Sequence, residues 1–164
     1  YCQCEKCAAV DKQYASFTPE EKMYSTHGGE KYPALGSGSI LAFVNKVADR
    51  FPDKIISTLA YQYSRVPPKD ILPRKNVNIM LCSIESTRNE TLEAGDTAFA
   101  SDLKGWGKIT NNILVWDYTI RFSNLLAPFP NMRILQPNIQ FFWKKTSIFI
   151  KNRRKLGEKE NILI

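Results

Sequence analysis

Residues 59–63 (LAYQY) begin as an apolar strand and end in aromatic and polar side chains. The same order recurs in residues 80–85 (MLCSIE) and 114–118 (LVWDY). A strand that only packs in a core has no need of such an ending. In a parallel α/β sheet or barrel, however, the carboxyl ends of the strands border the ligand site. The three segments therefore predict parallel strands that open onto a site, and aromatic rings beside carboxylates suit a sugar.

The rest of the chain supplies further helix and strand patterns. Apolar residues at helical spacing predict a helix over 39–51, and helices are also expected over 99–109 and 138–145. Strands are expected over 55–63, 76–84, 112–118 and 146–150. The first of these strands has the continuous apolar centre of a strand buried on both faces, whereas residues 1–38 are expected to be loop-rich. These three helices and four strands, interpreted as alternating along the chain, favour βαβ units around a parallel sheet.

Length and charge narrow the class of protein. The 164 residues fit one domain, but a complete (β/α)₈ barrel needs about 200 or more. No apolar run reaches the roughly 18 residues of a membrane span. Residues 143–164 carry seven basic and two acidic residues, whereas residues 1–142 carry 16 and 14. A basic end of this kind is usually solvated, so no nucleic-acid partner is expected.

Two carboxylates are candidates for catalysis. Glu85 and Asp117 end neighbouring predicted strands, and glycoside hydrolysis commonly uses two carboxyl groups about 5 to 9.5 Å apart. Either residue could act as an acid, a base or a hydroxyl-binding group. The alternative is a structural role, in which each carboxylate caps a helix or pairs with an arginine.

Aromatic side chains accompany both carboxylates. Tyr61, Tyr63, Trp116 and Tyr118 are candidates for stacking on sugar rings, with ordinary core packing as the alternative. Because side chains alternate along a strand, the two tyrosines of the first segment should share one side, as should Trp116 and Tyr118. Tyr61 and Trp116 are the preferred site residues.

Three cysteines near the start form a C-x-C-x-x-C pattern. Cys2, Cys4 and Cys7 could hold a structural Zn²⁺ or part of an iron–sulfur site, with Cys82 or His27 as the fourth ligand. A disulfide between two of the three, or free thiols, are the alternatives. The single histidine excludes a His-rich catalytic zinc site, and no Gly-rich phosphate loop is present. No other cofactor is expected.

Ordered motifs across residues 1–142 resemble those of one known family. They lie at 1–7 (YCQCEKC), 37–48, 58–61, 67–68, 76–77, 82–85, 106, 116–118 and 128–131. They resemble the domain of unknown function numbered 4838, common in large proteins of gut and soil Bacteroidetes. That family is similar to glycoside hydrolases with a TIM barrel, distantly including α-glucuronidases and β-hexosaminidases.

The resemblance implies a partial (β/α)₈ TIM barrel. Residues 1–142 would be its C-terminal half, with strands five to eight, and residues 143–164 a basic, divergent tail. The parent protein would be glycoside hydrolase-like, would act on or bind poly- and oligosaccharides, and would be periplasmic or extracellular. Its N-terminal half would then be a partner of this chain. A non-catalytic carbohydrate-binding or degenerate barrel is the alternative, ahead of a metal-stabilised nucleic-acid binder.

The two ends of the chain add further expectations. The chain opens at Tyr1 on the cysteine pattern, without a signal peptide or initiator Met, which indicates a segment of a longer protein. In the family, an Asp just before that pattern is the best catalytic candidate, so the isolated chain is expected to show little glycosidase activity. The change of composition at Trp143 resembles a frameshifted or degraded gene end.

Overall fold

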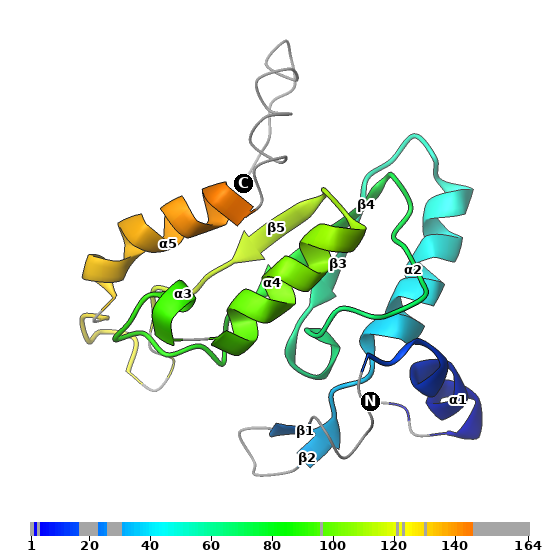
Figure 1. The fold of residues 1–164 in the computed structure, drawn as a ribbon, viewed down its shortest axis with the longest axis horizontal. Helices are drawn as coiled ribbons and strands as arrows, with labels where there is room; N and C mark the ends of the chain where they lie inside the picture. Colours follow the sequence, from blue (N-terminus) through cyan, green and yellow to red (C-terminus); the bar gives the residue numbers. More distant parts are fainter. Residues whose placement is uncertain are drawn as a thin grey trace.

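A parallel sheet with helices forms the centre of the structure (Figure 1). The computed structural model describes residues 2, 4–16, 23–25, 31–95, 97–120, 122, 124–129 and 131–145. The elements are, in order, α1 (Glu5–Tyr14), β1 (Met23–Ser25), β2 (Lys31–Pro33), α2 (Ser37–Arg50), β3 (Ile56–Ala60), the 3₁₀ helix η1 (Gln62–Ser64), β4 (Val77–Cys82), α3 (Leu92–Gly95), α4 (Thr97–Ile109), β5 (Ile113–Trp116) and α5 (Met132–Lys145). The strand expected over 146–150 lies outside the described residues.

The main sheet has the order β3-β4-β5. Both pairings are parallel, with Ala60 opposite Leu81 and Cys82 opposite Trp116. The predicted parallel strands, adjacent in chain order, are therefore confirmed for these three. Over the described residues the sheet is open, with β3 and β5 at its edges. A separate antiparallel pair, β1 and β2, precedes it.

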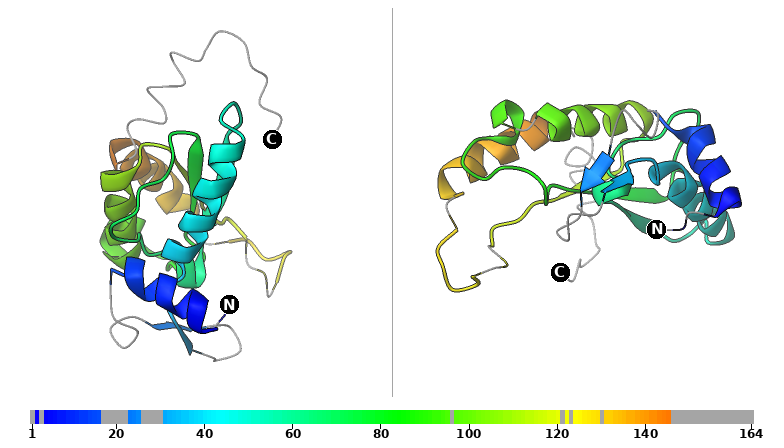
Figure 2. Two further views of the ribbon diagram at one scale, coloured as in Figure 1. Left: turned by 90° about the vertical axis from the view of Figure 1, so that its right-hand side faces the viewer. Right: turned by 90° about the horizontal axis from the view of Figure 1, so that it is seen from below.

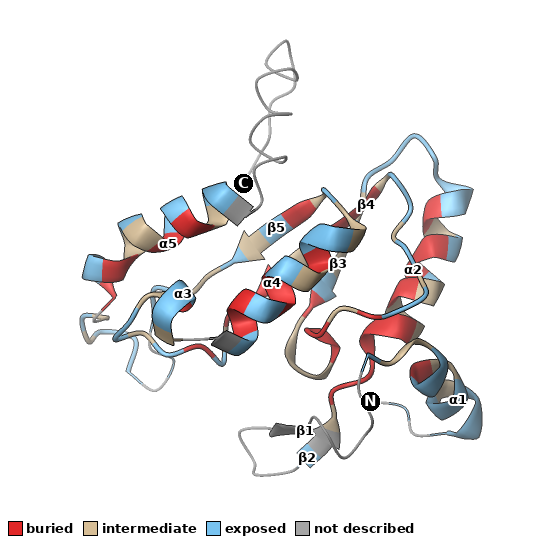
Figure 3. Ribbon diagram, viewed as in Figure 1, coloured by how far each residue is buried: buried red, intermediate tan, exposed pale blue. Residues whose placement is uncertain are grey.

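One face of the sheet carries the helices. Alternate residues of β4 on this face, Val77, Ile79 and Leu81, are fully buried against residues of α2, α4 and α5. Figure 3 shows buried residues concentrated along α2, β4 and α4, and the right view of Figure 2 shows α4 and α5 on one side of the strands. The burial of this face accounts for the core of the fold.

The other face of the sheet is apolar but partly exposed. Leu59, Met80 and Leu114 lie side by side across the three strands, and Trp116 lies one step further along β5. Leu59 is 45% exposed, Leu114 38% and Trp116 46%. We call these four residues the apolar sheet face. The expectation that the first strand is buried on both faces is wrong, because β3 is an edge strand and only the central β4 is buried on both sides.

The predicted helices are found, with shifted ends. The helix expected over 39–51 is α2, and the one over 99–109 is α4. The helix expected over 138–145 begins earlier, at Met132, and continues through Pro137. No helix in the described part of the chain is long and apolar enough to cross a membrane.

Two expectations fail in the connections. The first 38 residues are not all loop, because α1 forms there; its only buried residue is Asp11, so it has no apolar stripe to reveal it. The strict alternation of helices and strands also fails, because the crossover from β3 to β4 contains only the short η1. Gly38 allows α1 to pack on α2, since a Cβ at this position would lie 2.4 Å from Tyr14 Cβ.

Candidate functional site

The carboxyl ends of β3, β4 and β5 form one edge of the sheet, which we call the rim. The parallel register brings Ala60, Cys82 and Trp116 to this edge. Tyr61 and Asp117 directly follow Ala60 and Trp116 in the chain, so they also lie at the rim. This is the location that the strand endings predict for the candidate site.

Asp117 joins the ends of β4 and β5. Its Oδ1 accepts hydrogen bonds from Ser83 Oγ at 2.6 Å, from Arg88 Nη1 at 3.0 Å and from the Tyr118 backbone N–H at 2.9 Å. Arg88 also donates to the Ser83 carbonyl at 2.6 Å. Within the described residues, no donor contacts the other carboxylate oxygen of Asp117, Oδ2. One oxygen is thus held by the protein while the second remains open to a ligand.

Glu85 is held in a similar way by a different arginine. Arg65 Nη1 donates to Glu85 Oε2 at 3.0 Å, and Arg65 Nε donates to Asp102 Oδ2 at 2.8 Å. The indole N–H of Trp106 fixes the backbone of Arg65 through a 2.7 Å bond to its carbonyl. The side chains of Arg65 and Asp102 are 9% and 4% exposed, whereas that of Glu85 is 28% exposed. Glu85 Oε1 has no donor in the described part of the chain.

Aromatic rings extend the rim beyond β5. Trp116 and Tyr118 stack with ring centroids 6.1 Å apart and planes 19° apart. Phe122 meets Tyr118 edge-on at 5.8 Å, and the Arg88 guanidinium lies 5.9 Å from the centre of the Tyr118 ring. The expectation that Trp116 and Tyr118 share one side is confirmed. Trp116 is 46% exposed, so this row leaves aromatic surface accessible at the end of β5.

Electrostatic interactions connect the remaining rim residues. Burial and, less strongly, the charges of Glu85 and Cys82 raise the pKa of Tyr61. The pKa of Tyr118 is raised to about 12, mainly by burial and then by Cys82, Tyr61 and Glu85. The positive charge of Arg88 acts in the opposite direction and lowers it. Burial and the charge of Glu85 raise the pKa of Cys82 to about 11. Burial is therefore the main cause of all three shifts, and the charge of Glu85 adds to each of them.

Tyr63 does not belong with Tyr61. The strand ends at Ala60, and η1 then turns the chain through Gln62, whose φ is 53°. The expectation that both tyrosines point to one side of an extended strand is therefore wrong. Tyr61 remains at the rim, where Gln62 Nε2 donates to its hydroxyl at 3.2 Å, while Tyr63 lies within η1.

The N-terminal cysteines do come together. The Sγ atoms of Cys2, Cys4 and Cys7 all lie within 4.8 Å of one another. Cys82, expected as a fourth ligand, is not part of this group; it is buried at the end of β4. His27, the other expected ligand, lies outside the described residues.

Comparison with known families gives one match. A family model described as Domain of unknown function (DUF4838) matches residues 1–159. The chain belongs to the DUF4838 family. No curated protein and no solved structure matches it. The match extends past residue 142, where the resemblance was expected to end, and includes most of the basic segment 143–164.

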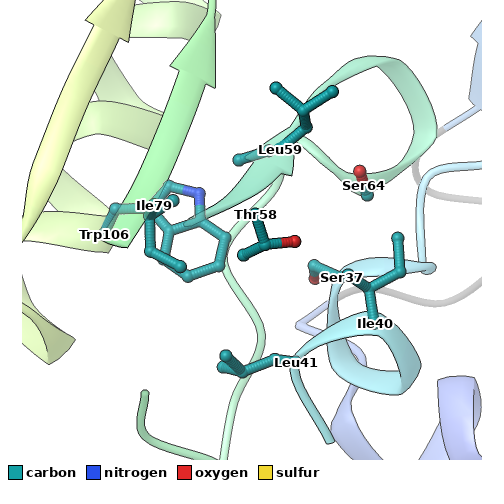
Figure 4. A pocket seen from close by; sticks show the side chains of 9 residues that line it. Ser37, Ile40, Leu41, Thr58, Leu59, Ser64, Ile79 and Trp106 are labelled. Carbon is teal, nitrogen blue, oxygen red and sulfur yellow. The ribbon is translucent and has the colours of Figure 1, made fainter. Parts of the chain in front are cut away.

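A small cavity in this DUF4838 chain lies between α2 and β3 (Figure 4). Its volume is about 10 Å³, room for about one water molecule. The side chains around it include Ser37, Ile40, Leu41, Thr58, Ile79 and Trp106. Neither Glu85 nor Asp117 lines it, so the common cavity expected for them is not this one.

Sequence reasoning missed the two arginines that organise the rim of this DUF4838 domain. Arg88 follows Glu85 in a polar loop, and this proximity is a signal that could have been used. Arg65 offers no local signal, because its buried partner Asp102 is 37 positions away in the sequence. Both arginines leave one oxygen of the paired rim carboxylate open, which suits recognition of ligand hydroxyl groups.

Proposed function

We propose that this chain supplies the sugar-binding rim of a carbohydrate-active protein of the glycoside hydrolase-like barrel type. One observation carries the proposal: at the carboxyl end of β5, the exposed, stacked Trp116 is followed directly by Asp117, whose carboxylate is held by Ser83 at the end of β4. An aromatic face packs against the apolar face of a sugar ring, and a carboxylate oxygen accepts bonds from its hydroxyl groups.

The arginines make the rim carboxylates suitable receptors. Each guanidinium holds one carboxylate oxygen, so the side chain is fixed before a ligand arrives. Fixing polar groups in advance reduces the entropy that binding must overcome. Glu85 Oε1 and Asp117 Oδ2 are then the natural acceptors for sugar hydroxyls. This arrangement favours binding as the primary role of both residues.

The apolar sheet face supports the barrel part of the proposal. In a barrel, the face of the sheet away from the helices packs into a filled interior. Leu59 and Leu114 are more than a third exposed, which is the surface that the remaining strands of a barrel would cover. The parallel strand order and the helices on the opposite face agree with this architecture.

Hydrolysis is the second candidate function. Two carboxylates follow neighbouring parallel strands, and glycoside hydrolysis commonly uses a pair of carboxyl groups. In that case the parent protein would be a hydrolase. Glu85 or Asp117 would transfer a proton in addition to binding hydroxyl groups.

Oligosaccharide binding by the full chain tests the proposal. Titration calorimetry against a panel of plant and host oligosaccharides should detect a ligand, and Trp116→Ala should weaken its binding by at least about tenfold, or about 1.4 kcal/mol. Trp143→Ala is the matched control, because Trp143 is 47% exposed but lies in the last turns of α5. Equal affinity of the two variants, or no binding across the panel, would refute a sugar-binding rim.

The same samples separate binding from hydrolysis. Glu85→Gln and Asp117→Asn keep the shape of the side chains but remove their charge. If aryl-glycosides are turned over by the wild-type chain and not by these variants, hydrolysis is the correct function. If oligosaccharides bind without turnover, the rim is a receptor.

A further inference from the structure

The three N-terminal cysteines form a compact group that the rim does not use. Cys2, Cys4 and Cys7 are all free thiols, and their Sγ atoms lie within 4.8 Å of one another. Cys2 and Cys4 are exposed and Cys7 is half-buried, so solvent ions reach them. Three converging thiols form a set of soft ligands.

We propose that these three thiols bind a single zinc ion as thiolates. Zinc–sulfur bonds of about 2.3 Å in a tetrahedral site place the sulfur atoms about 3.8 Å apart. The observed limit of 4.8 Å is close to that spacing, so a single ion requires only small movements of the side chains. In a [4Fe–4S] cluster each cysteine binds a different iron atom, which needs a wider spacing of the ligands.

The start of α1 explains why the thiols converge. Cys4 occupies the N-cap position with an extended backbone (φ −65°, ψ 153°), so the chain turns there. Cys7 lies three residues later, in the first turn, on the same side of the helix. Cys2 approaches from the preceding segment. The C-x-C-x-x-C spacing and the helix start therefore create the group together.

The charge of the complex suits this position. Each thiol releases its proton to solvent when the metal binds, so three thiolates and Zn²⁺ carry a net charge of −1. The positive end of the helix dipole stabilises such a charge at the N-terminus of α1.

Within the described residues, the group supplies three ligands and no fourth. A water molecule or an external ligand would then complete the tetrahedron, as in zinc sites with an open position. The ion would fix the start of α1. The other end of that helix is already anchored, because the Tyr14 carbonyl accepts a 2.9 Å bond from the Lys69 N–H and Ser16 Oγ donates to the Pro67 carbonyl at 2.6 Å.

Cobalt and zinc titrations of the reduced, metal-free full chain test this site. We expect one Co²⁺ per chain, with the charge-transfer and ligand-field bands of tetrahedral thiolate coordination, and displacement of Co²⁺ by Zn²⁺. Zinc should also raise the melting temperature. Mutation of a residue that only hydrogen-bonds to a metal ligand typically lowers metal affinity 10- to 100-fold. Loss of a ligand itself in Cys4→Ser or Cys7→Ser should therefore lower zinc affinity by at least about 100-fold.

The control is Cys82→Ala, which removes the cysteine outside the group and should leave metal binding unchanged. Cys4→Ser changes an exposed side chain, so its circular dichroism should match that of the wild type and loss of metal cannot be attributed to unfolding. Absence of the charge-transfer band, or unchanged metal affinity in Cys4→Ser, would overturn the proposal. So would a disulfide within the group that persists under reducing conditions, detected as a mass lower by two hydrogens.

Discussion

Removal of the Asp102 charge should destabilise the fold far more than removal of the Glu85 charge, although both residues pair with Arg65. Asp102 lies 2.8 Å from Arg65 Nε, and both side chains are less than a tenth exposed. Glu85 lies 3.0 Å from Arg65 Nη1 and is 28% exposed. Water can replace the partly exposed Glu85 as a partner of Arg65, but it cannot replace the buried Asp102.

The expected magnitudes follow from this difference in burial. Removal of one partner of a buried ion pair costs about 3–5 kcal/mol when the other charge is left buried and unpaired, and the lower end applies here because Arg65 keeps its bond to Glu85. We therefore expect Asp102→Asn to lower the free energy of unfolding by about 3 kcal/mol and Glu85→Gln by less than about 1 kcal/mol. At about 2–4 °C per kcal/mol for a chain of this size, Asp102→Asn should lower the melting temperature by roughly 6–12 °C.

Urea unfolding followed by circular dichroism measures the change in unfolding free energy for each variant. A double-mutant cycle isolates the coupling of Asp102 and Glu85 through Arg65. The double variant should differ from the sum of the single variants, because both carboxylates bind the same guanidinium. If Asp102→Asn and Glu85→Gln destabilise the chain equally, or if Asp102→Asn costs less than about 1 kcal/mol, the assignment of Arg65 as a buried anchor of the rim is wrong.

Two further predictions concern α4 and the rim tyrosine. Gly105→Ala should destabilise the chain by about 1–3 kcal/mol, because the new Cβ would lie 2.6 Å from Pro67 Cγ. Gly107→Ala, at an exposed position of the same helix, should stabilise the chain by up to about 1 kcal/mol. Unfolding measurements that rank the stabilities of the two variants the other way would contradict this packing. The pKa of Tyr118 is raised from 10.0 to about 12, so its contribution to stability is complete below about pH 10 and is lost as the pH rises towards 12. Tyr118→Phe should therefore show a shallower fall in melting temperature over that interval, and an identical pH dependence would refute the burial of this hydroxyl.

The sequence was sufficient to predict the parallel sheet but not the environment of each strand. The apolar stretches in β3, β4 and β5 all indicate strands, yet only β4 is buried on both faces. The difference arises from the position of a strand in the sheet, since an edge strand lacks a neighbour on one side. Apolar composition alone does not encode that position. The helix α1 was missed for a related reason, because its contact with α2 depends on the small size of Gly38 and not on an apolar stripe.

The candidate site was predictable only in part. Parallel strands place their carboxyl ends at one edge, which is why Glu85 and Asp117 could be assigned to one rim from the sequence. The end of β3 could not be assigned as well, because Gln62 adopts a positive φ that a non-glycine residue rarely takes. The partners of the carboxylates were also beyond reach, since Arg65 meets Asp102 only in the folded chain.

The crossover from β3 to β4 ties the rim to the rest of the molecule. Parallel strands are usually joined by a helix, but here only η1 occupies the connection, so other elements must hold it in place. Trp106 of α4 binds the Arg65 carbonyl at 2.7 Å, and Ser16, just after α1, binds the Pro67 carbonyl at 2.6 Å. The position of Arg65, and through it the orientation of Glu85, therefore depends on contacts from both helices. A zinc ion at the start of α1 would strengthen one of these two supports without touching the rim itself.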